Sequence, residues 1–201
     1  KILGSTGMDA LTHAVEAYVC KASNILTDAI ALKAIQMIGK HLVPAVKTHN
    51  EESLDAMMAA STMAGMAFGN SDVASVHSIS EALGGFYDIP HGVANAMMLA
   101  PVSRLSISGN PQKYADVAAA LGVDTKNMSV IEAANTGVDL MQKMADELEI
   151  PHFKDLDIID PKDFDRLAKT AANADETFDN PVLMDQSDFK KLFEDLYNEG
   201  K

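Results

Sequence analysis

The chain has 201 residues, of which 47% are hydrophobic and 22% are charged, a composition typical of a soluble globular protein with one core. Its formal net charge of -13 and its lack of basic clusters argue against nucleic-acid binding, because phosphate backbones attract clustered Lys and Arg. Cys20 is the only cysteine, so no disulfide can form within the chain. There is neither a signal-peptide pattern nor an apolar run of about 18 residues. We therefore expect a cytoplasmic protein that binds neither nucleic acid nor membrane.

Helix signals recur along the chain with little competing strand signal. Thr6 and Asp9 form an [ST]-x-x-[DE] start signal in front of the first apolar-periodic segment. Ser129 and Glu132 form a capping box before one of the longest predicted helices. The helices predicted after the first one cover about 28–40, 53–68, 72–83, 91–105, 111–121 and 130–149, and two more begin near 161 and 187.

Proline and glycine mark several of the predicted helix ends. Pro44 should kink or end the second helix, the Gly84-Gly85 pair should end the fourth, and Pro90 should open the fifth. Runs rich in Val, Ile, Thr and aromatic residues, which mark strands, are missing. The sequence therefore predicts an all-α domain of eight or nine helices without internal repeats. We also expect the small-xxx-small pair Gly65 and Gly69 to mark close helix packing.

Four residues have the spacing and chemistry of a divalent-metal site. Asp9 and His13 are four residues apart, so their side chains share one face of a helix. His77 begins a second motif, and His91 would return to the same place from the start of the following helix. Imidazole and carboxylate ligands together suit Zn²⁺ or Fe²⁺ better than Ca²⁺ or Mg²⁺, which prefer oxygen ligands.

Each of these residues also has a purely structural interpretation. Asp9 could be a helix cap or a partner of the helix dipole, as the Thr6-x-x-Asp9 signal implies. A single His near an apolar face is more often a satisfied core or surface residue than a ligand. Spacing alone therefore leaves open both a metal site and a set of unrelated side chains.

The sequence around these residues resembles the iron-containing alcohol dehydrogenases. The similar stretches are G-S-T-G-M-D-A-L-T-H-A-V-E-A-Y, from Gly4 to Tyr18, and V-H-S-I-S-E-A-L-G-G-F-Y-D-I-P-H-G-V-A-N, from Val76 to Asn95. In that family the Asp and His of the first motif bind the metal, together with the first His of the second motif and the His of its P-H-G. By this resemblance the metal ligands are Asp9, His13, His77 and His91.

The resemblance implies a fold and a domain organisation. It implies an all-α multi-helix domain of the dehydroquinate synthase-like or iron-containing alcohol dehydrogenase type, with residues 1–201 as a single metal-binding catalytic domain. Members of the family also carry an N-terminal α/β dinucleotide-binding domain, and this chain has no G-x-G-x-x-G motif. We therefore expect that domain to be absent from this chain. The start at Lys1 rather than Met also leads us to expect a fragment or a processed chain.

The resemblance further implies a reaction and its partners. The reaction is reversible oxidation of a small alcohol to an aldehyde or ketone, with NAD or NADP in the full-length enzyme. Fe(II) is the implied ion and Zn²⁺ the alternative, because zinc outcompetes Fe(II) at most N/O sites. The expected partners are the substrate, the missing nucleotide-binding domain and, as a possibility, further copies in a homo-oligomer. Alone, the chain should be inactive or weakly active, since the cofactor would lack most of its contacts.

One position departs from the family pattern. The family usually has a second His four residues after the first ligand of the second motif, where this chain has Glu81. A carboxylate can also exchange protons, so Glu81 is our candidate catalytic residue. The alternatives are a second carboxylate in the metal shell and a structural Glu without a chemical role.

Two other functions remain open from the sequence. One is membership of the related zinc-dependent glycerol dehydrogenase branch, which shares the two-domain plan; the long V-H…P-H-G match favours the iron group. The other is a non-catalytic helical module that binds metal or serves in assembly. The absence of a nucleotide-binding element keeps this second alternative open.

Overall fold

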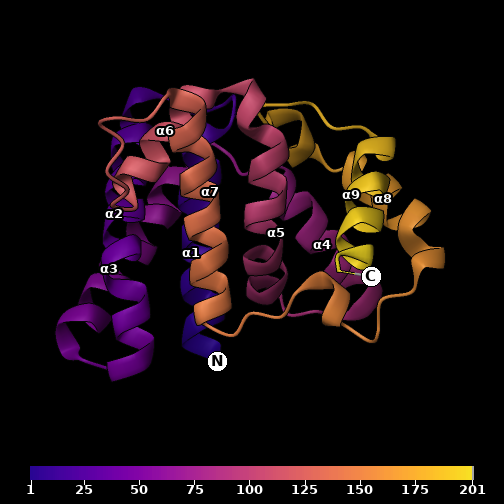
Figure 1. The fold of residues 1–201 in the computed structure, drawn as a ribbon, viewed down its shortest axis with the longest axis horizontal. Coiled ribbons are helices and arrows are strands. Elements are labelled where there is room, and N and C mark those ends of the chain that lie inside the picture. The colour runs from indigo at the N-terminus through magenta and orange to yellow at the C-terminus, as the bar shows by residue number, and fades with distance from the viewer. Residues whose placement is uncertain (201) are drawn as a thin grey trace.

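A computed structural model describes residues 1–200, and within that range it contains α-helices, short 3-10 helices and no β-strand (Figure 1). The α-helices are α1 (Ile2–Val19), α2 (Ile25–Thr48), α3 (Glu51–Phe68), α4 (Ser75–Tyr87), α5 (His91–Ser106), α6 (Pro111–Ala120), α7 (Val130–Glu147), α8 (Phe164–Ala172) and α9 (Gln186–Asn198). The 3-10 helices are η1 (Ile107–Gly109), η2 (Phe153–Asp155), η3 (Pro161–Asp163) and η4 (Asp175–Asp179). The prediction of an all-α fold is confirmed.

The helices form two groups that meet at α1 and α5. Helices α1, α2 and α3 pack on one another, while α4 packs on both α5 and α8, and α8 pairs with α9. Figure 1 shows α2 and α3 at one end of the molecule, α8 and α9 at the other, and α5 between them. Because α1 also packs on α5, the N-terminal group and the C-terminal group share a continuous apolar core.

Fully buried side chains from most of the helices build this core. Its largest members include Leu11 in α1, Ile38 in α2, Leu83 in α4, Met98 in α5 and Phe193 in α9. Burial of each such side chain contributes about 1.5–3 kcal/mol relative to exposure. The metal motifs thus lie on helices that are held firmly by packing.

Several predicted helix ends are wrong. Helix α1 begins at Ile2, so Thr6 is no start signal; its hydroxyl donates to the carbonyl oxygen of Ile2 at 3.0 Å inside the first turns. Helix α4 continues through Gly84 and Gly85 and ends only at Tyr87. The aromatic side chain of Tyr87 packs against the core, and this packing extends the helix past two weak helix formers.

The second helix also differs from its prediction. It begins at Ile25 rather than near 28, because Asn24 and Thr27 form a reciprocal capping box. Pro44 does not end the helix, which runs on to Thr48. Apolar packing on both sides of the proline outweighs the single backbone hydrogen bond that its missing N–H removes.

Among residues 1–200, α2 alone has the length and composition of a membrane span. Its Ala34, Ile38 and Leu42 are fully buried against the neighbouring helices. Its exposed side carries Lys33 and Lys40. This division into a buried apolar face and a charged face is typical of a core helix in a helical bundle.

Close helix packing occurs at a different glycine from the predicted pair. A Cβ atom on Gly65 would meet no atom within 4 Å, so the expectation of close packing there is wrong. A Cβ atom on Gly137 would instead lie 2.7 Å from the Cβ and 2.9 Å from the Cα of Ala118. Gly137 therefore allows α7 to approach α6 closely.

We expect Gly137→Ala to lower the free energy of unfolding by about 1–3 kcal/mol, because α6 and α7 would have to separate. Gly65→Ala is the matched control in open space, and it should raise stability by about 0.5–1 kcal/mol through helix propensity alone. Urea unfolding followed by circular dichroism measures both changes. Equal stabilities for the Gly137→Ala variant and the parent chain would show that the close approach is not needed.

Candidate metal centre

The four predicted ligands converge from three helices. Helix α1 carries Asp9 and His13 on successive turns, α4 carries His77 in its first turn, and α5 begins with His91. One possible ligand atom from each of the four residues lies within 4.8 Å of all the others. His77 is buried, Asp9 and His13 are partly buried, and His91 is exposed, so the cluster is open on one side.

A glycine brings the start of α5 against α1. Gly92 follows His91 directly, and a Cβ atom on it would lie 3.2 Å from the carbonyl oxygen of Ser5 and 3.4 Å from the Cβ of Asp9. A larger residue would push the two helices apart and carry His91 away from Asp9. The glycine of the P-H-G motif thus has a packing role beside the ligand.

The distances within the cluster suit a single ion. The Nε2 atoms of His13 and His77 are 3.1 Å apart, and the Nε2 atom of His91 lies 3.8 Å from Oδ1 of Asp9. Two nitrogen ligands about 2.0–2.1 Å from one tetrahedral ion would be roughly 3.3 Å apart. Small side-chain adjustments would therefore bring the four donors to coordination distance.

Each imidazole is held at its outer nitrogen, Nδ1. The Nδ1 atom of His13 lies 2.9 Å from the main-chain oxygen of Asp9, that of His77 lies 2.5 Å from Oε2 of Glu16, and that of His91 lies 3.1 Å from Oγ of Ser80. The Nε2 atoms are left to face the cluster. This is the usual arrangement of metal-binding histidines, whose second nitrogen donates to a carboxylate, carbonyl or similar group.

Glu16 is part of the site, although the motif spacing predicts no role for it. Its side chain is only 3% exposed, and its carboxylate also accepts hydrogen bonds from the backbone N–H groups of Ala74 and Val76. The sequence does contain a signal for Glu16: it is a charged residue within the apolar segment of α1, three positions after His13. A buried charge requires partners, and here they come from α4.

Asn95 is a second residue that spacing does not predict. It is fully buried, and its amide nitrogen donates to Oδ1 of Asp9 at 2.7 Å. The same nitrogen lies 3.1 Å from Nε2 of His77 and 3.0 Å from Nε2 of His91. Its carbonyl oxygen has no hydrogen-bond partner within the described part of the chain. Oδ1 of Asp9 and the Nε2 atoms of His77 and His91 thus converge on the NH₂ group of Asn95, and such a convergence of acceptor atoms is what a cation site requires.

Burial and neighbouring charges shift the pKa values of two rings in opposite directions. Burial lowers the pKa of His13, and the adjacent His77 lowers it further against the opposing charge of Asp9. Burial also acts to lower the pKa of His77, but the hydrogen bond and charge of Glu16 outweigh it and raise that pKa. A proton therefore binds more readily to His77 than to His13, and a metal ion that binds His77 would compete with that proton.

Glu81 lies beside the cluster rather than within it. Its side chain is exposed, one helical turn after His77, and it is not among the residues whose ligand atoms converge. Its negative charge contributes to the raised pKa of His77. The aromatic ring of Phe68, at the end of α3, covers another side of the cluster with its centroid 4.5 Å from that of His13.

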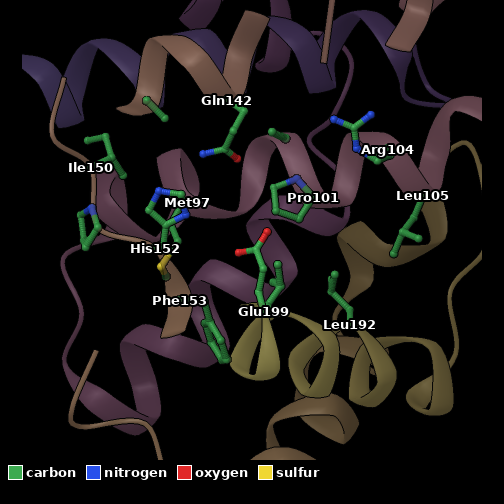
Figure 2. A pocket seen from close by; sticks show the side chains of 14 residues that line it. Met97, Pro101, Arg104, Leu105, Gln142, Ile150, His152, Phe153, Leu192 and Glu199 are labelled. Carbon is green, nitrogen blue, oxygen red and sulfur yellow. The ribbon is translucent and has the colours of Figure 1, made fainter. Parts of the chain in front are cut away.

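A separate cavity of about 340 Å³ lies on the other side of α5 (Figure 2). Met97 and Arg104 line it, whereas His91 and Asn95 point the opposite way on the same helix. Arg104 is already paired, since its guanidinium donates to Asp139 at 2.6 Å. Figure 2 shows this cavity between α5, α7 and α9, without any of the four predicted ligands.

Comparison with known proteins decides the family. The model of the Fe-containing alcohol dehydrogenase family, C-terminal part, matches residues 4–197. This chain belongs to the iron-containing alcohol dehydrogenase family. The chain is 38% identical over 198 residues to 1,3-propanediol dehydrogenase of Citrobacter freundii, covering 98% of this chain and 51% of that protein.

Two further known proteins support this family assignment. An NAD-dependent methanol dehydrogenase of Bacillus methanolicus is 33% identical over 189 residues, covering 94% of this chain and 50% of that protein. The solved structure of an alcohol dehydrogenase from Oenococcus oeni superposes with a TM-score of 0.93 at 35% identity, covering 97% of this chain and 51% of that one. The chain thus spans about half the length of these relatives and corresponds to the C-terminal part of the family.

We expect the chain to bind about one divalent ion per molecule and His77→Ala to bind it more than about 100-fold more weakly. Loss of a residue that only orients a ligand already weakens metal binding about 10- to 100-fold. Elemental analysis and Zn²⁺ competition with a chelator measure this. His152→Ala is the matched control, because His152 lies outside the cluster and contacts Asp146. Equal metal content in His77→Ala and the parent chain would contradict the ligand assignment.

Proposed function

We propose that this chain is the metal-binding half of an NAD(P)-dependent alcohol dehydrogenase that interconverts small alcohols with aldehydes or ketones. The observation that carries the proposal is the clustering of ligand atoms from three imidazoles and one carboxylate within 4.8 Å of one another, with His91 exposed to solvent. Its metal ligands would be Asp9, His13, His77 and His91. The enzymatic nature of the family supports the same conclusion.

The donor set fits Fe(II), with Zn²⁺ as the alternative ion. When bound, such an ion supplies Lewis-acid polarisation of the alcohol or carbonyl oxygen. The contribution of the chain is to hold the four donors on packed helices and to keep one side of the centre open at His91. Phe68 shields another side from water, since its ring packs on His13.

The nicotinamide cofactor would be bound mainly by a second, N-terminal α/β domain. Residues 1–200 contain neither a strand nor a glycine-rich dinucleotide turn, and 1–201 would form a single all-α domain. The relative from Bacillus methanolicus is named as NAD-dependent, which supports NAD as the cofactor, with NADP as the alternative. Homo-oligomer formation and a cytoplasmic location stay predictions.

Glu81 would carry protons between the reacting alcohol oxygen and solvent. Its exposed carboxylate lies on α4 one turn after His77 and is open to bulk water. Its influence on the pKa of His77 supports its closeness to the centre. General acid–base groups of this kind contribute about 10²- to 10⁴-fold to a rate.

Joining the chain to its N-terminal domain should produce NAD(P)-linked oxidation of small alcohols once Fe(II) or Zn²⁺ is supplied, whereas the chain alone should be nearly inactive. Absorbance of the reduced nicotinamide measures the rate. Substrates without and with the glycerol skeleton, tested side by side, separate the iron group from the glycerol dehydrogenase branch. A joined protein with full metal content and no activity on any alcohol would favour a non-catalytic module.

In the joined protein, Glu81→Gln should lower kcat at least about tenfold while leaving the metal content unchanged, because the amide cannot exchange protons. Glu81→His should retain most of the rate, since imidazole can take over the proton transfer. Steady-state kinetics with parallel elemental analysis measure both effects. An unchanged kcat in Glu81→Gln would assign this residue a structural role only.

A further inference from the structure

We propose that Glu16 is the positioning residue that fixes the tautomer and direction of the His77 ring and joins this ligand to the start of α4. The proposal rests on the metal site proposed above. It assigns a role to a residue that contacts no ion itself.

Both oxygens of the Glu16 carboxylate accept hydrogen bonds from α4. Oε2 accepts from the backbone N–H of Ala74 at 2.9 Å and lies 2.5 Å from Nδ1 of His77. Oε1 accepts from the backbone N–H of Val76 at 2.7 Å. Ala74 is the N-cap residue of α4 and has no side chain that could cap the helix. Glu16 therefore caps α4 from α1, in place of a local capping residue.

The hydrogen-bond pattern selects one tautomer of His77. A carboxylate only accepts hydrogen bonds, so Nδ1 of His77 must carry the hydrogen in this contact. The neutral ring then has its lone pair on Nε2, which lies 3.1 Å from Nε2 of His13 and faces the cluster. The opposite tautomer would place a hydrogen where the ion has to bind.

An amide could not reproduce this set of contacts. A glutamine at position 16 has one accepting oxygen and one donating NH₂ group. In either orientation its NH₂ group would face an N–H donor, of α4 or of His77, with no acceptor between them. Because the side chain at position 16 is only 3% exposed, bulk water cannot supply the missing acceptor. Since Asp9 and His13 also lie on α1, this helix supplies two ligands directly and orients a third through Glu16.

The first measurement is the tautomer of His77 in the metal-free parent chain, from the ¹⁵N chemical shifts of its ring. The expected result for the neutral ring is hydrogen on Nδ1 alone, and a neutral ring with hydrogen on Nε2 alone would overturn the proposal without the need for any variant. The second measurement is the affinity for Zn²⁺ by chelator competition. Glu16→Gln should bind Zn²⁺ about 10- to 100-fold more weakly than the parent chain.

Asp28→Asn is the matched control, because it removes a partly buried carboxylate whose partner is Lys113 rather than a histidine. It should keep the parent affinity for Zn²⁺ even if stability falls. Parent affinity and an unchanged His77 tautomer in a folded Glu16→Gln variant would overturn the role of Glu16. A parent chain that binds no divalent ion would instead overturn the proposed function, while the tautomer measurement would still decide whether Glu16 fixes the ring.

Discussion

The buried contact between the Glu16 carboxylate and the first turn of α4 is the constraint on which the metal centre depends. It joins α1, which carries Asp9 and His13, to the helix that carries His77. The carboxylate is removed from water, so its energy is favourable only while all three donors stay in place. The same contact that stabilises the helix junction therefore keeps a ligand ring pointing toward its partners.

Helix α5 completes the centre from the other side. His91 is its first residue, and Asn95, one turn later, is the buried amide that contacts the Asp9 carboxylate. Gly92 between them allows the close approach to α1. His91, Gly92 and Asn95 thus lie within one and a half turns of α5. The position of this helix end therefore sets the geometry of both the ligand His91 and the buried amide of Asn95.

Much of this architecture could be predicted, but some helix ends could not. Capping at Ser129 is confirmed because both halves of that signal are local side chains. The expectations at Thr6 and at the Gly84-Gly85 pair are wrong, because tertiary packing extends α1 and α4 past these signals. Glu16 and Asn95 could not be assigned from spacing, since their partners are distant in the chain and lie on other helices.

The sequence by itself determined the helical class, the identity of the four candidate ligands and the family resemblance, because these depend on local periodicity and contiguous motifs. Only the tertiary structure decided that the four donors converge and that Glu81 lies beside them. It alone decided which nitrogen of each histidine faces inward. The reason is physical: a ring's direction depends on the acceptor at its second nitrogen, and for His77 that acceptor comes from a helix sixty-one residues away.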